Sequence, residues 1–337
     1  MRADSSILIS IVVPVYNTEP RYLDRCLSVF RRSFDGVELI VVDDGSDESV
    51  REYLTGSLLP TVQTHWSYYE QPNAGVNAAR GRGVREARGD YIFFLDSDDF
   101  LDEEEFRKTC KLLRDKRPDV LGYNICVVDA RGTQVDAWRR CDEPYKRIGG
   151  AELMAMGCNL WTQVVRRRFL EGDALVQGCT IGEDLASITP ILTKTNNLSM
   201  TSCYPYRYVQ RASSVTHVFA PDAAFGILDA FASMLERMPS PLGEYQDAVE
   251  WLAIQHVLYF GGKRMLKTNG FDKEGKRRIF AFVEERFPSW RTNPYLKRER
   301  RVRGADFALI TAGHWRLYLL LSGAGHALRT LKAVVAS

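Results

Sequence analysis

PNAGVNAARGRGVREARGDYIFFLDSDDFL, residues 72–101, gives the clearest indication of the fold class in this chain. It contains an Ala-rich helical pattern at residues 76–88, an apolar run at residues 91–95 and a group of acidic residues directly after that run. A helix that leads into a short apolar strand is the repeating unit of a parallel sheet with helices on both faces. Ligands of such sheets bind beyond the carboxyl ends of the strands, so the acidic group marks where chemistry is expected.

The same alternation runs through the first third of the chain and continues less regularly beyond it. Strands are predicted at residues 7–15, 37–42, 66–70, 91–95 and 120–128, and helices at residues 21–34, 49–55, 76–88 and 103–114. A hairpin or excursion at residues 130–145, a helix entering a loop at 150–162, a helix at 184–195 and a strand at 204–210 are predicted next. From Pro221 onward the patterns are helical only, at residues 222–238, 245–267 and 273–287.

These patterns predict an α/β fold: a Rossmann-like, mostly parallel sheet with helices on both faces, followed by a helical C-terminal extension. The change of pattern places a domain boundary between residues 217 and 218, which divides the chain into residues 1–217 and residues 218–337.

Composition disfavours several classes of protein. The formal net charge is +2, from 45 Lys and Arg and 43 Asp and Glu, so it predicts no nucleic-acid partner. The seven cysteines are scattered and form no C-x-x-C pair, which favours reduced thiols in a cytoplasmic protein over a disulfide framework or a zinc site. The sequence shows no signal-peptide pattern and no run of about 18 apolar residues, so we expect a soluble or peripheral protein.

The acidic group Asp96-Ser97-Asp98-Asp99 is the strongest chemical signal in the sequence. Like charges this close are costly unless a cation neutralises them. Mg²⁺ takes one or two protein carboxylates and completes its shell with phosphates and water, and alternate residues of a D-x-D pair can point to one side. The alternative is that Asp98 or Asp99 caps the next helix, but a cap needs only one acid. The pattern therefore favours a metal site at Asp96 and Asp98.

Three further polar clusters follow predicted strands, and each has a plain structural alternative. Tyr16 could stack on a nucleobase or cover the edge of the core. Asp43 and Asp44 could accept from a base or a ribose hydroxyl, or stand in a strand-to-helix turn. Gly75 would let the backbone approach a ligand closely. The residues leave these alternatives open.

The motifs SIVVPVYN (residues 10–17), ELIVVDDGSDE (38–48), residues 71–101 and the later GEDL (182–185) together resemble family 2 glycosyltransferases with the GT-A fold. More narrowly, they resemble bacterial enzymes that build capsule, exopolysaccharide or lipopolysaccharide chains. The resemblance is strong over residues 7–115, weaker to about residue 217 and absent beyond. One departure is Asn77, which stands where these proteins usually have Ser.

The resemblance implies metal-dependent transfer of a sugar, with inversion, from a nucleoside diphosphate sugar to a saccharide or lipid-linked saccharide. The donor it most commonly implies is a uridine diphosphate (UDP) sugar. It divides residues 1–217 into a nucleotide-sugar half, about residues 1–115, and an acceptor half, about residues 116–217. The residues implied to hold the nucleoside are Pro14, Tyr16, Asp43, Asp44 and Gly75. Asp98 would bind Mn²⁺ or Mg²⁺ directly, and Asp96 would contact ribose or metal-bound water.

The resemblance also assigns roles in the second half of the domain. Asp184 would be the general base that takes a proton from the acceptor hydroxyl, although acids also favour the first turn of a helix for its dipole. Arg211 would stabilise the charge of the leaving diphosphate. His217 would complete the metal shell, although a lone His is more often structural. Trp161 could be an acceptor platform or a core residue.

The C-terminal region carries the basic run Lys297–Arg303 and several amphipathic segments. We expect peripheral contact with an anionic inner-membrane surface, or else packing on the catalytic domain or a homodimer interface.

Other classes are weaker interpretations of the sequence. A sugar nucleotidyltransferase would carry a basic, Gly-rich phosphate loop after the first strand, where this chain has Val-Tyr-Asn-Thr-Glu. No G-x-G-x-x-G follows the first strand, which disfavours a dinucleotide enzyme. A non-catalytic nucleotide-sugar-binding or assembly protein on the same fold remains the main alternative.

Overall fold

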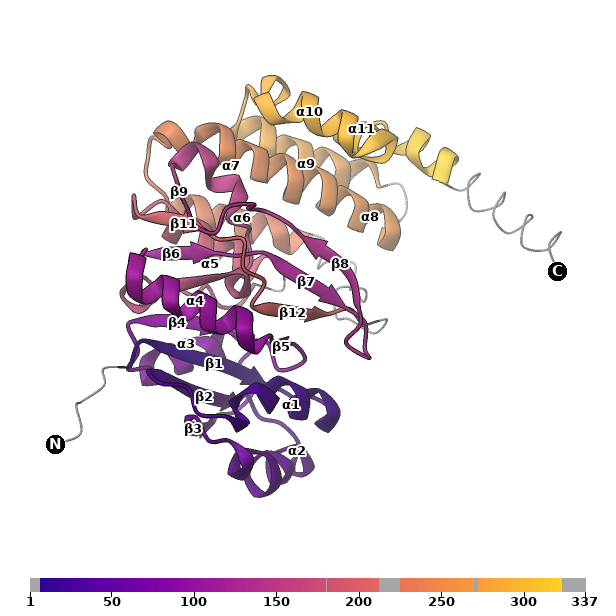
Figure 1. The fold of residues 1–337 in the computed structure, drawn as a ribbon. Coiled ribbons are helices and arrows are strands. Elements are labelled where there is room, and N and C mark those ends of the chain that lie inside the picture. The colour runs from indigo at the N-terminus through magenta and orange to yellow at the C-terminus, as the bar shows by residue number, and fades with distance from the viewer. Residues whose placement is uncertain (1–6, 180, 212–224, 270–271, 323–337) are drawn as a thin grey trace. The chain divides into compact units, whose positions relative to one another are not determined.

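The structure, a computed structural model, describes residues 7–179, 181–211, 225–269 and 272–322 (Figure 1). The chain divides into two compact units, residues 1–178 with 183–215, and residues 179–182 with 216–337.

An eight-stranded sheet with the order β3-β2-β1-β4-β10-β6-β11-β9 is the centre of the first unit. Its first four strands by position are parallel, whereas β10 is antiparallel to both of its neighbours. The bounds are β1 (Ile9–Val15), β2 (Val37–Asp43), β3 (His65–Glu70), β4 (Tyr91–Phe94), β6 (Val120–Gly122), β9 (Lys146–Ile148), β10 (Gln163–Arg166) and β11 (Leu198–Met200). The predicted α/β fold with a mostly parallel sheet is confirmed.

Helices cover both faces of this sheet, and every residue of β1, β2 and β4 is therefore buried. On one face α3 (Val76–Glu86) packs so closely that a Cβ on Gly83 would lie 2.3 Å from Val12 Cγ1. On the other face the Phe93 ring of β4 contacts Phe106 of α4 (Glu103–Lys116) at 5.9 Å between centroids. The remaining α-helices of this unit are α1 (Pro20–Leu27), α2 (Glu48–Glu52) and α5 (Glu183–Leu192).

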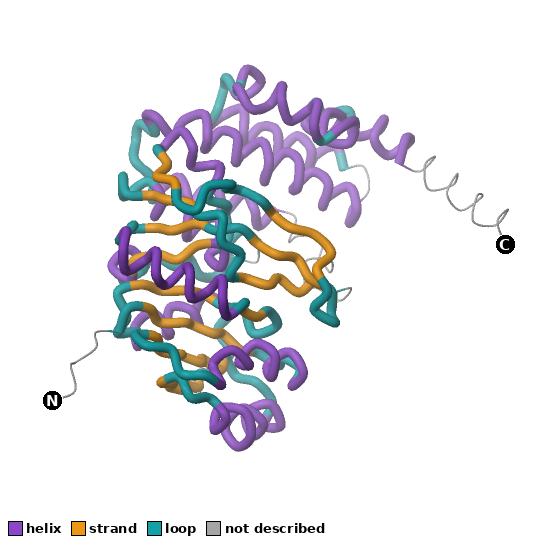
Figure 2. Tube along the Cα trace, viewed as in Figure 1, coloured by secondary structure: helices purple, strands orange, loops and turns teal. Residues whose placement is uncertain are grey.

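A second, four-stranded sheet has the order β5-β12-β7-β8 (Figure 2). Its strands are β5 (Phe100–Leu101), β7 (Ile125–Val128), β8 (Gln134–Trp138) and β12 (Tyr206–Val209). The hairpin or excursion predicted at residues 130–145 supplies only one strand of a hairpin, because β8 pairs antiparallel with β7, which precedes the predicted segment.

The prediction of one strand over residues 120–128 is wrong, because the chain leaves the large sheet after β6 and enters the small one as β7. Asn124 lies at the crossing. Its side chain donates to the Cys141 carbonyl at 2.8 Å and accepts from the backbone N–H groups of Arg140 and Cys141 at 2.7 and 3.0 Å. The polar contacts of one buried Asn therefore divide an apolar run into two strands.

The described part of the second unit contains helices and no strands. They are α6 (Gly226–Glu236), α7 (Gln246–Leu252), α8 (Gly262–Asn269), α9 (Lys273–Arg286), α10 (Pro294–Val302) and α11 (Gly304–Thr311). A π-helical segment, Ala253–Gly261, joins α7 to α8, so the helix predicted at residues 245–267 is one continuous helical run. The fully buried rings of Phe231, Trp290, Phe307 and Trp315 contribute to its core. The predicted helical C-terminal extension is confirmed.

Candidate active site

The polar clusters after the first strands lie at one edge of the large sheet. Val15 is in register with Asp43 on the neighbouring strand, and Val12 is in register with Phe94. The chain therefore leaves β1, β2 and β4 at the same carboxyl edge, where Tyr16, Asp44 and Asp96 follow.

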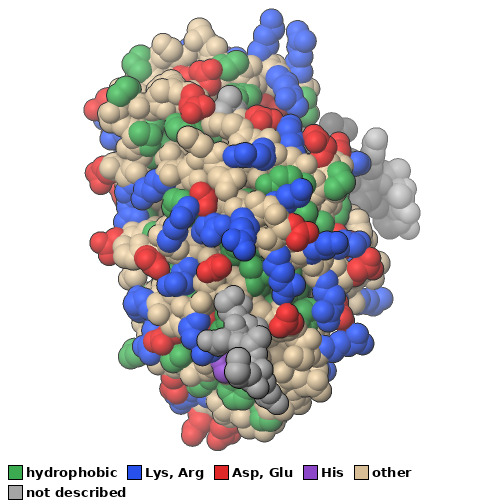
Figure 3. Space-filling model, turned by 60° about the vertical axis from the view of Figure 1, so that its left-hand side comes forward, with side chains coloured by type: hydrophobic (Ala, Val, Ile, Leu, Met, Phe, Trp, Pro, Cys, Tyr) green, Lys and Arg blue, Asp and Glu red, His purple; other side chains and the backbone are tan. Residues whose placement is uncertain are grey.

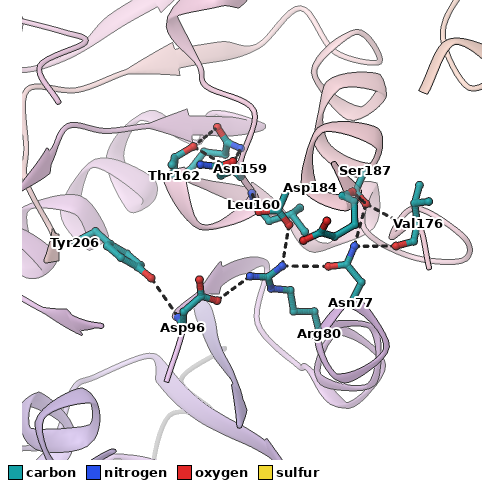
Figure 4. Close-up of polar contacts among 12 residues, drawn as sticks. Asn77, Arg80, Asp96, Asn159, Leu160, Thr162, Val176, Asp184, Ser187 and Tyr206 are labelled. Carbon is teal, nitrogen blue, oxygen red and sulfur yellow. Dashed lines mark hydrogen bonds and ion pairs between the residues drawn. The ribbon is translucent and has the colours of Figure 1, made fainter. Parts of the chain in front are cut away.

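Arg80 of α3 is the centre of the polar network at this edge (Figure 4). Its guanidinium donates to Asp96 Oδ1 at 2.7 Å and to Asp184 Oδ1 at 2.8 Å, although these acids are 88 positions apart in the sequence. The arginine is 3% exposed. Burial alone would lower the pKa of Arg80, but the charges of Asp184 and Asp96 raise it above its ordinary value. Arg80 therefore stays charged and holds two carboxylates together.

Asn77 extends this network by one helical turn. Its Oδ1 accepts from Arg80 at 3.1 Å, while its Nδ2 donates to the Val176 carbonyl at 2.8 Å and to Ser187 Oγ at 3.4 Å. The sequence singled out Asn77 only as a departure from the family pattern, and it assigned no role to Arg80. In the structure, the side chains of Asn77 and Arg80 connect α3 to α5. The i, i+3 spacing of Asn77 and Arg80 was the available signal.

Asp184 lies in the first turn of α5, and its side chain is 14% exposed. Its Oδ2 accepts from the backbone N–H of Leu160 at 3.3 Å. Burial raises the pKa of Asp184 to about 6, and the charge of Arg80 opposes that rise. A carboxylate with this pKa is ionised at neutral pH and is a stronger base than an ordinary Asp.

The acids after β4 have three different environments. Asp96 pairs with Arg80, and Asp98 forms an ion pair with Arg211, whose guanidinium also lies 4.8 Å from the centroid of the Tyr22 ring. Asp99 is buried and accepts from Tyr206 Oη and from the backbone N–H of Val209, both at 2.7 Å. Burial and then the charge of Asp96 raise the pKa of Asp99 well above its ordinary value. None of these acids caps α4.

The cap of α4 is Asp102, whose side chain accepts from the Glu105 N–H at 3.0 Å. The helix-cap alternative for Asp98 and Asp99 is therefore wrong.

Asp43 and Asp44 organise the loops around the predicted nucleoside site. Asp44 accepts from Gln71 Nε2 at 2.7 Å and from the N–H groups of Ala74 and Gly75 at 3.0 and 2.8 Å. Gly75 has a φ of +93°, a backbone conformation that favours glycine. Asp43 accepts from the Ser46 N–H at 2.8 Å and from Tyr68 Oη at 2.9 Å.

The other predicted site residues lie as follows. Pro14 is buried in β1, whereas the Tyr16 side chain directly after this strand is 55% exposed. Asp44 and Gly75 are brought together, and so are Asp96 and Asp184. His217 lies outside the described residues. Trp161 is 7% exposed, so its ring belongs to the core.

A divalent cation at this site would need carboxylate oxygens as ligands. Among the described residues, no group of three or more His, Cys, Asp or Glu could hold a metal ion. One oxygen of Asp96 is in an ion pair with Arg80, and one oxygen of Asp98 is in an ion pair with Arg211. Two hard carboxylate oxygens fit a Mg²⁺ or Mn²⁺ that takes its other ligands from diphosphate and water.

Comparisons with known proteins agree with this geometry. Residues 10–165 match the family model "Glycosyl transferase family 2". An uncharacterized glycosyltransferase of Haemophilus influenzae is 34% identical over 128 residues, which are 38% of this chain and 51% of that protein. A putative teichuronic acid biosynthesis glycosyltransferase of Bacillus subtilis, TuaG, is 27% identical over 61% of this chain and 81% of that protein. The chain spans about half of the Haemophilus protein, and smaller parts of the next most similar relatives.

The solved structure of S. aureus TarS 1–349 in complex with UDP-GlcNAc is similar in fold, with a TM-score of 0.65 and 19% identity. The match covers 90% of this chain and 89% of that one. The same protein in complex with UDP gives a TM-score of 0.63 over 83% of this chain and 81% of that one, at 18% identity. The resemblance found in the sequence is thereby confirmed. Residues 10–165, less than half of the chain, are therefore similar to glycosyl transferase family 2, and this part of the chain has the GT-A fold.

Proposed function

We propose that this protein is a metal-dependent, inverting glycosyltransferase that moves a sugar from a nucleoside diphosphate sugar to a hydroxyl of a saccharide or lipid-linked saccharide. The proposed donor is a UDP-sugar. The observation that carries the proposal is the convergence of Asp96 and Asp184 on the buried guanidinium of Arg80, at the carboxyl edge of the parallel strands. Asp96 follows a strand of the nucleotide-sugar half, and Asp184 lies in the first turn of a helix of the acceptor half.

Asp184 is the general base of the proposed reaction. As the acceptor oxygen attacks the anomeric carbon, the bond from this carbon to the diphosphate breaks, and the proton of the acceptor hydroxyl passes to the Asp184 carboxylate. Attack occurs from the face opposite the nucleotide, so the anomeric configuration inverts. Arg80 is a positioning residue: its ion pair and the Leu160 N–H fix the orientation of the carboxylate.

The nucleotide half of the site would bind the donor. Tyr16 is exposed and free to stack on a base, and Asp44 holds the loop that ends at Gly75. Asp98 and Asp96 would hold the cation, and His217 is the proposed further ligand. The bound cation would neutralise charge on the diphosphate. Arg211 would leave Asp98 and pair with the departing diphosphate instead.

The relatives support a role in making cell-surface polysaccharide. The names of several contain "glycosyltransferase", and TuaG is assigned to teichuronic acid biosynthesis. TarS has been solved with UDP and with UDP-GlcNAc, which supports UDP as the first nucleotide to test. The alternatives are a non-catalytic nucleotide-sugar-binding or assembly protein and, with less support, a sugar nucleotidyltransferase.

The C-terminal region is the proposed contact with a membrane surface. No described helix is long and apolar enough to cross a bilayer. Exposed Leu317, Leu320 and Leu321 have i, i+3, i+4 spacing in the helical residues 315–322, and α10 carries the basic run. Co-sedimentation with anionic and neutral vesicles tests the contact, and Leu320→Glu with Leu321→Glu should abolish it. A homodimer through this surface is the alternative, which light scattering would reveal.

The charge on the surface shown does not indicate a nucleic-acid partner. On the face shown in Figure 3, Lys and Arg side chains are interspersed with Asp and Glu. The net charge of +2 agrees with this mixture.

Calorimetric titration with UDP tests the donor site. The protein is titrated in Mn²⁺ and in EDTA, and the experiment is repeated with Asp98→Ala. We expect binding that needs the metal and that Asp98→Ala weakens strongly. Binding of another nucleoside diphosphate in place of UDP would change the donor, whereas absence of binding to any nucleoside diphosphate would overturn the enzyme proposal.

A further inference from the structure

A cluster of aromatic rings adjoins the site and has a partly exposed rim. Trp161 and Tyr206 are buried in it, with ring centroids 4.9 Å apart. Trp138 and Tyr208 are only partly buried and pack on Trp161, at 5.7 and 5.3 Å. Their own centroids lie 5.5 Å apart. The two outer rings therefore rest on a rigid inner ring.

Strand pairing explains why these rings share one face of the small sheet. Trp138 on β8 is in register with Ile125 on β7, and Ile125 is in register with Tyr206 on β12. Tyr208 lies two residues beyond Tyr206, on the same face. Arg207, between them, points the other way and pairs with Asp102.

This face is connected directly to the proposed catalytic groups. Tyr206 Oη accepts from the Asp96 N–H at 3.2 Å. The residue before Trp161 is Leu160, whose N–H donates to Asp184. The buried rings Tyr206 and Trp161 thus belong to segments that contact Asp96 and Asp184. Trp138 and Tyr208, whose partly exposed rings can take the face of a sugar, pack on Trp161.

Arg140 adds an unpaired positive charge to the same region. Its guanidinium donates to the Met156 carbonyl at 3.3 Å and lies 5.9 Å from the centroid of the Trp138 ring. No Asp or Glu in the described part of the chain forms an ion pair with it, whereas its neighbour Arg139 pairs with Asp142. Burial lowers the pKa of Arg140, and only Cys158 and Tyr123 oppose this. A partly buried cation without a carboxylate partner is a site for an anion.

We propose that Trp138, Tyr208 and Arg140 form the acceptor subsite, and that the acceptor sugar carries a carboxylate or a phosphate that pairs with Arg140. This inference rests on the proposed function and narrows its acceptor to anionic saccharides. Trp138 and Tyr208 would stack on the apolar face of the sugar. Trp161 supports the platform from below and does not touch the acceptor.

Three small ligands on one scaffold test the charge requirement. They are methyl β-D-glucopyranoside, methyl β-D-glucuronoside and methyl β-D-glucopyranoside 6-phosphate, which carry no charge, a carboxylate and a phosphate. Their binding to the full chain is measured by ligand-observed NMR, with and without UDP and Mn²⁺. We expect at least one charged ligand to bind about tenfold more tightly than the neutral one, because hydrogen bonds to a charged group are the strong ones. Preference for the carboxylate would indicate a uronic acid acceptor, and preference for the phosphate a phosphorylated one.

Variants separate the contribution of the Arg140 charge to binding from the contribution of the aromatic rings. Arg140→Gln should remove the preference, Arg140→Lys should keep part of it, and Arg139→Gln, the matched control, should leave it unchanged. Trp138→Ala should weaken all three ligands alike. UDP binding should be unchanged in every variant, which also shows that the variants are folded.

Equal binding of neutral and charged ligands, no measurable binding of either charged ligand, or a preference that survives Arg140→Gln would overturn the inference. Absence of binding of any nucleoside diphosphate to the unmodified chain is a different result, because it refutes the proposed function. The glycoside titrations without nucleotide test the acceptor subsite independently of that result.

Discussion

Replacing Arg80 by Met tests the network on which the proposed site depends. The change removes a guanidinium that is 3% exposed and leaves two carboxylates without their cation. Breaking a buried ion pair in this way costs about 3–5 kcal/mol. The side chains of Asp96 and Asp184 are 28% and 14% exposed, so water compensates in part and we expect the lower end, about 3 kcal/mol.

The free energy of unfolding that Arg80→Met loses should depend on pH, and the direction of this dependence follows from the pKa of Asp184. Arg80 lowers the pKa of this carboxyl, which burial has raised to about 6, so removal of Arg80 should raise the pKa further. A carboxyl whose pKa is raised in the folded protein binds more protons there than in the unfolded chain, so stability increases as the pH falls. The free energy lost in Arg80→Met should therefore be smaller at pH 5 than at pH 8.

Hydrogen exchange of peptides from β4, followed against urea concentration, reports the opening of the first unit alone. The matched control is Arg85→Met, an exposed arginine on the same helix, for which a change within about 0.5 kcal/mol is expected. Arg80→Lys should lie between the two, because an ammonium keeps the charge without the planar fork. Equal losses in Arg80→Met and the control, or a loss that is the same at pH 5 and pH 8, would refute the reasoning.

Three further predictions follow from single contacts. The pH profile of kcat/KM should fall on the acid side with a midpoint near the pKa of about 6 given for Asp184, and Asp184→Asn should remove the activity while UDP binding persists; an acid limb near pH 4 would contradict the assignment. Asn77→Ala should cost about 1–3 kcal/mol in the opening free energy of the first unit, since it leaves buried partners without their hydrogen bonds; a neutral result would show that the contact with Val176 is not made. Gly83→Ala should cost about 1–3 kcal/mol because the new methyl would overlap Val12, whereas Gly56→Ala, which meets nothing within 4 Å, should be close to neutral.

The fold could be predicted from the sequence where local pattern and burial agree. Fully buried strands such as β1 and β4 appear as short apolar runs, and α3, the helix before β4, appears as an Ala-rich helical pattern. The antiparallel strand β10 escaped prediction because Gln163–Arg166 is only four residues long and its pairing partners are remote in sequence. Residues 120–128 were predicted as one strand because an apolar run does not show where the chain passes from one sheet to another.

The site was predictable as a set of strand ends but not as a set of contacts. The sequence placed Asp96 and Asp184 at the chemistry, yet it gave no reason for them to share one arginine, because that contact depends on how α3 packs against α5. Trp161 could not be assigned as core or platform from spacing alone. Only burial distinguishes it from the partly exposed Trp138.

Donor turnover is the most direct test of the central claim, that this chain is a glycosyltransferase with Asp184 as its base. The protein and its Asp184→Asn variant are incubated with Mn²⁺, each of several UDP-sugars and the anionic methyl glycosides, and released UDP and glycosylated product are measured. We expect acceptor-dependent UDP release with inversion at the anomeric carbon, by the unmodified chain only, while both proteins bind UDP. Donor binding without any turnover would contradict this expectation and support a non-catalytic nucleotide-sugar-binding protein, and full activity of Asp184→Asn would remove Asp184 as the base.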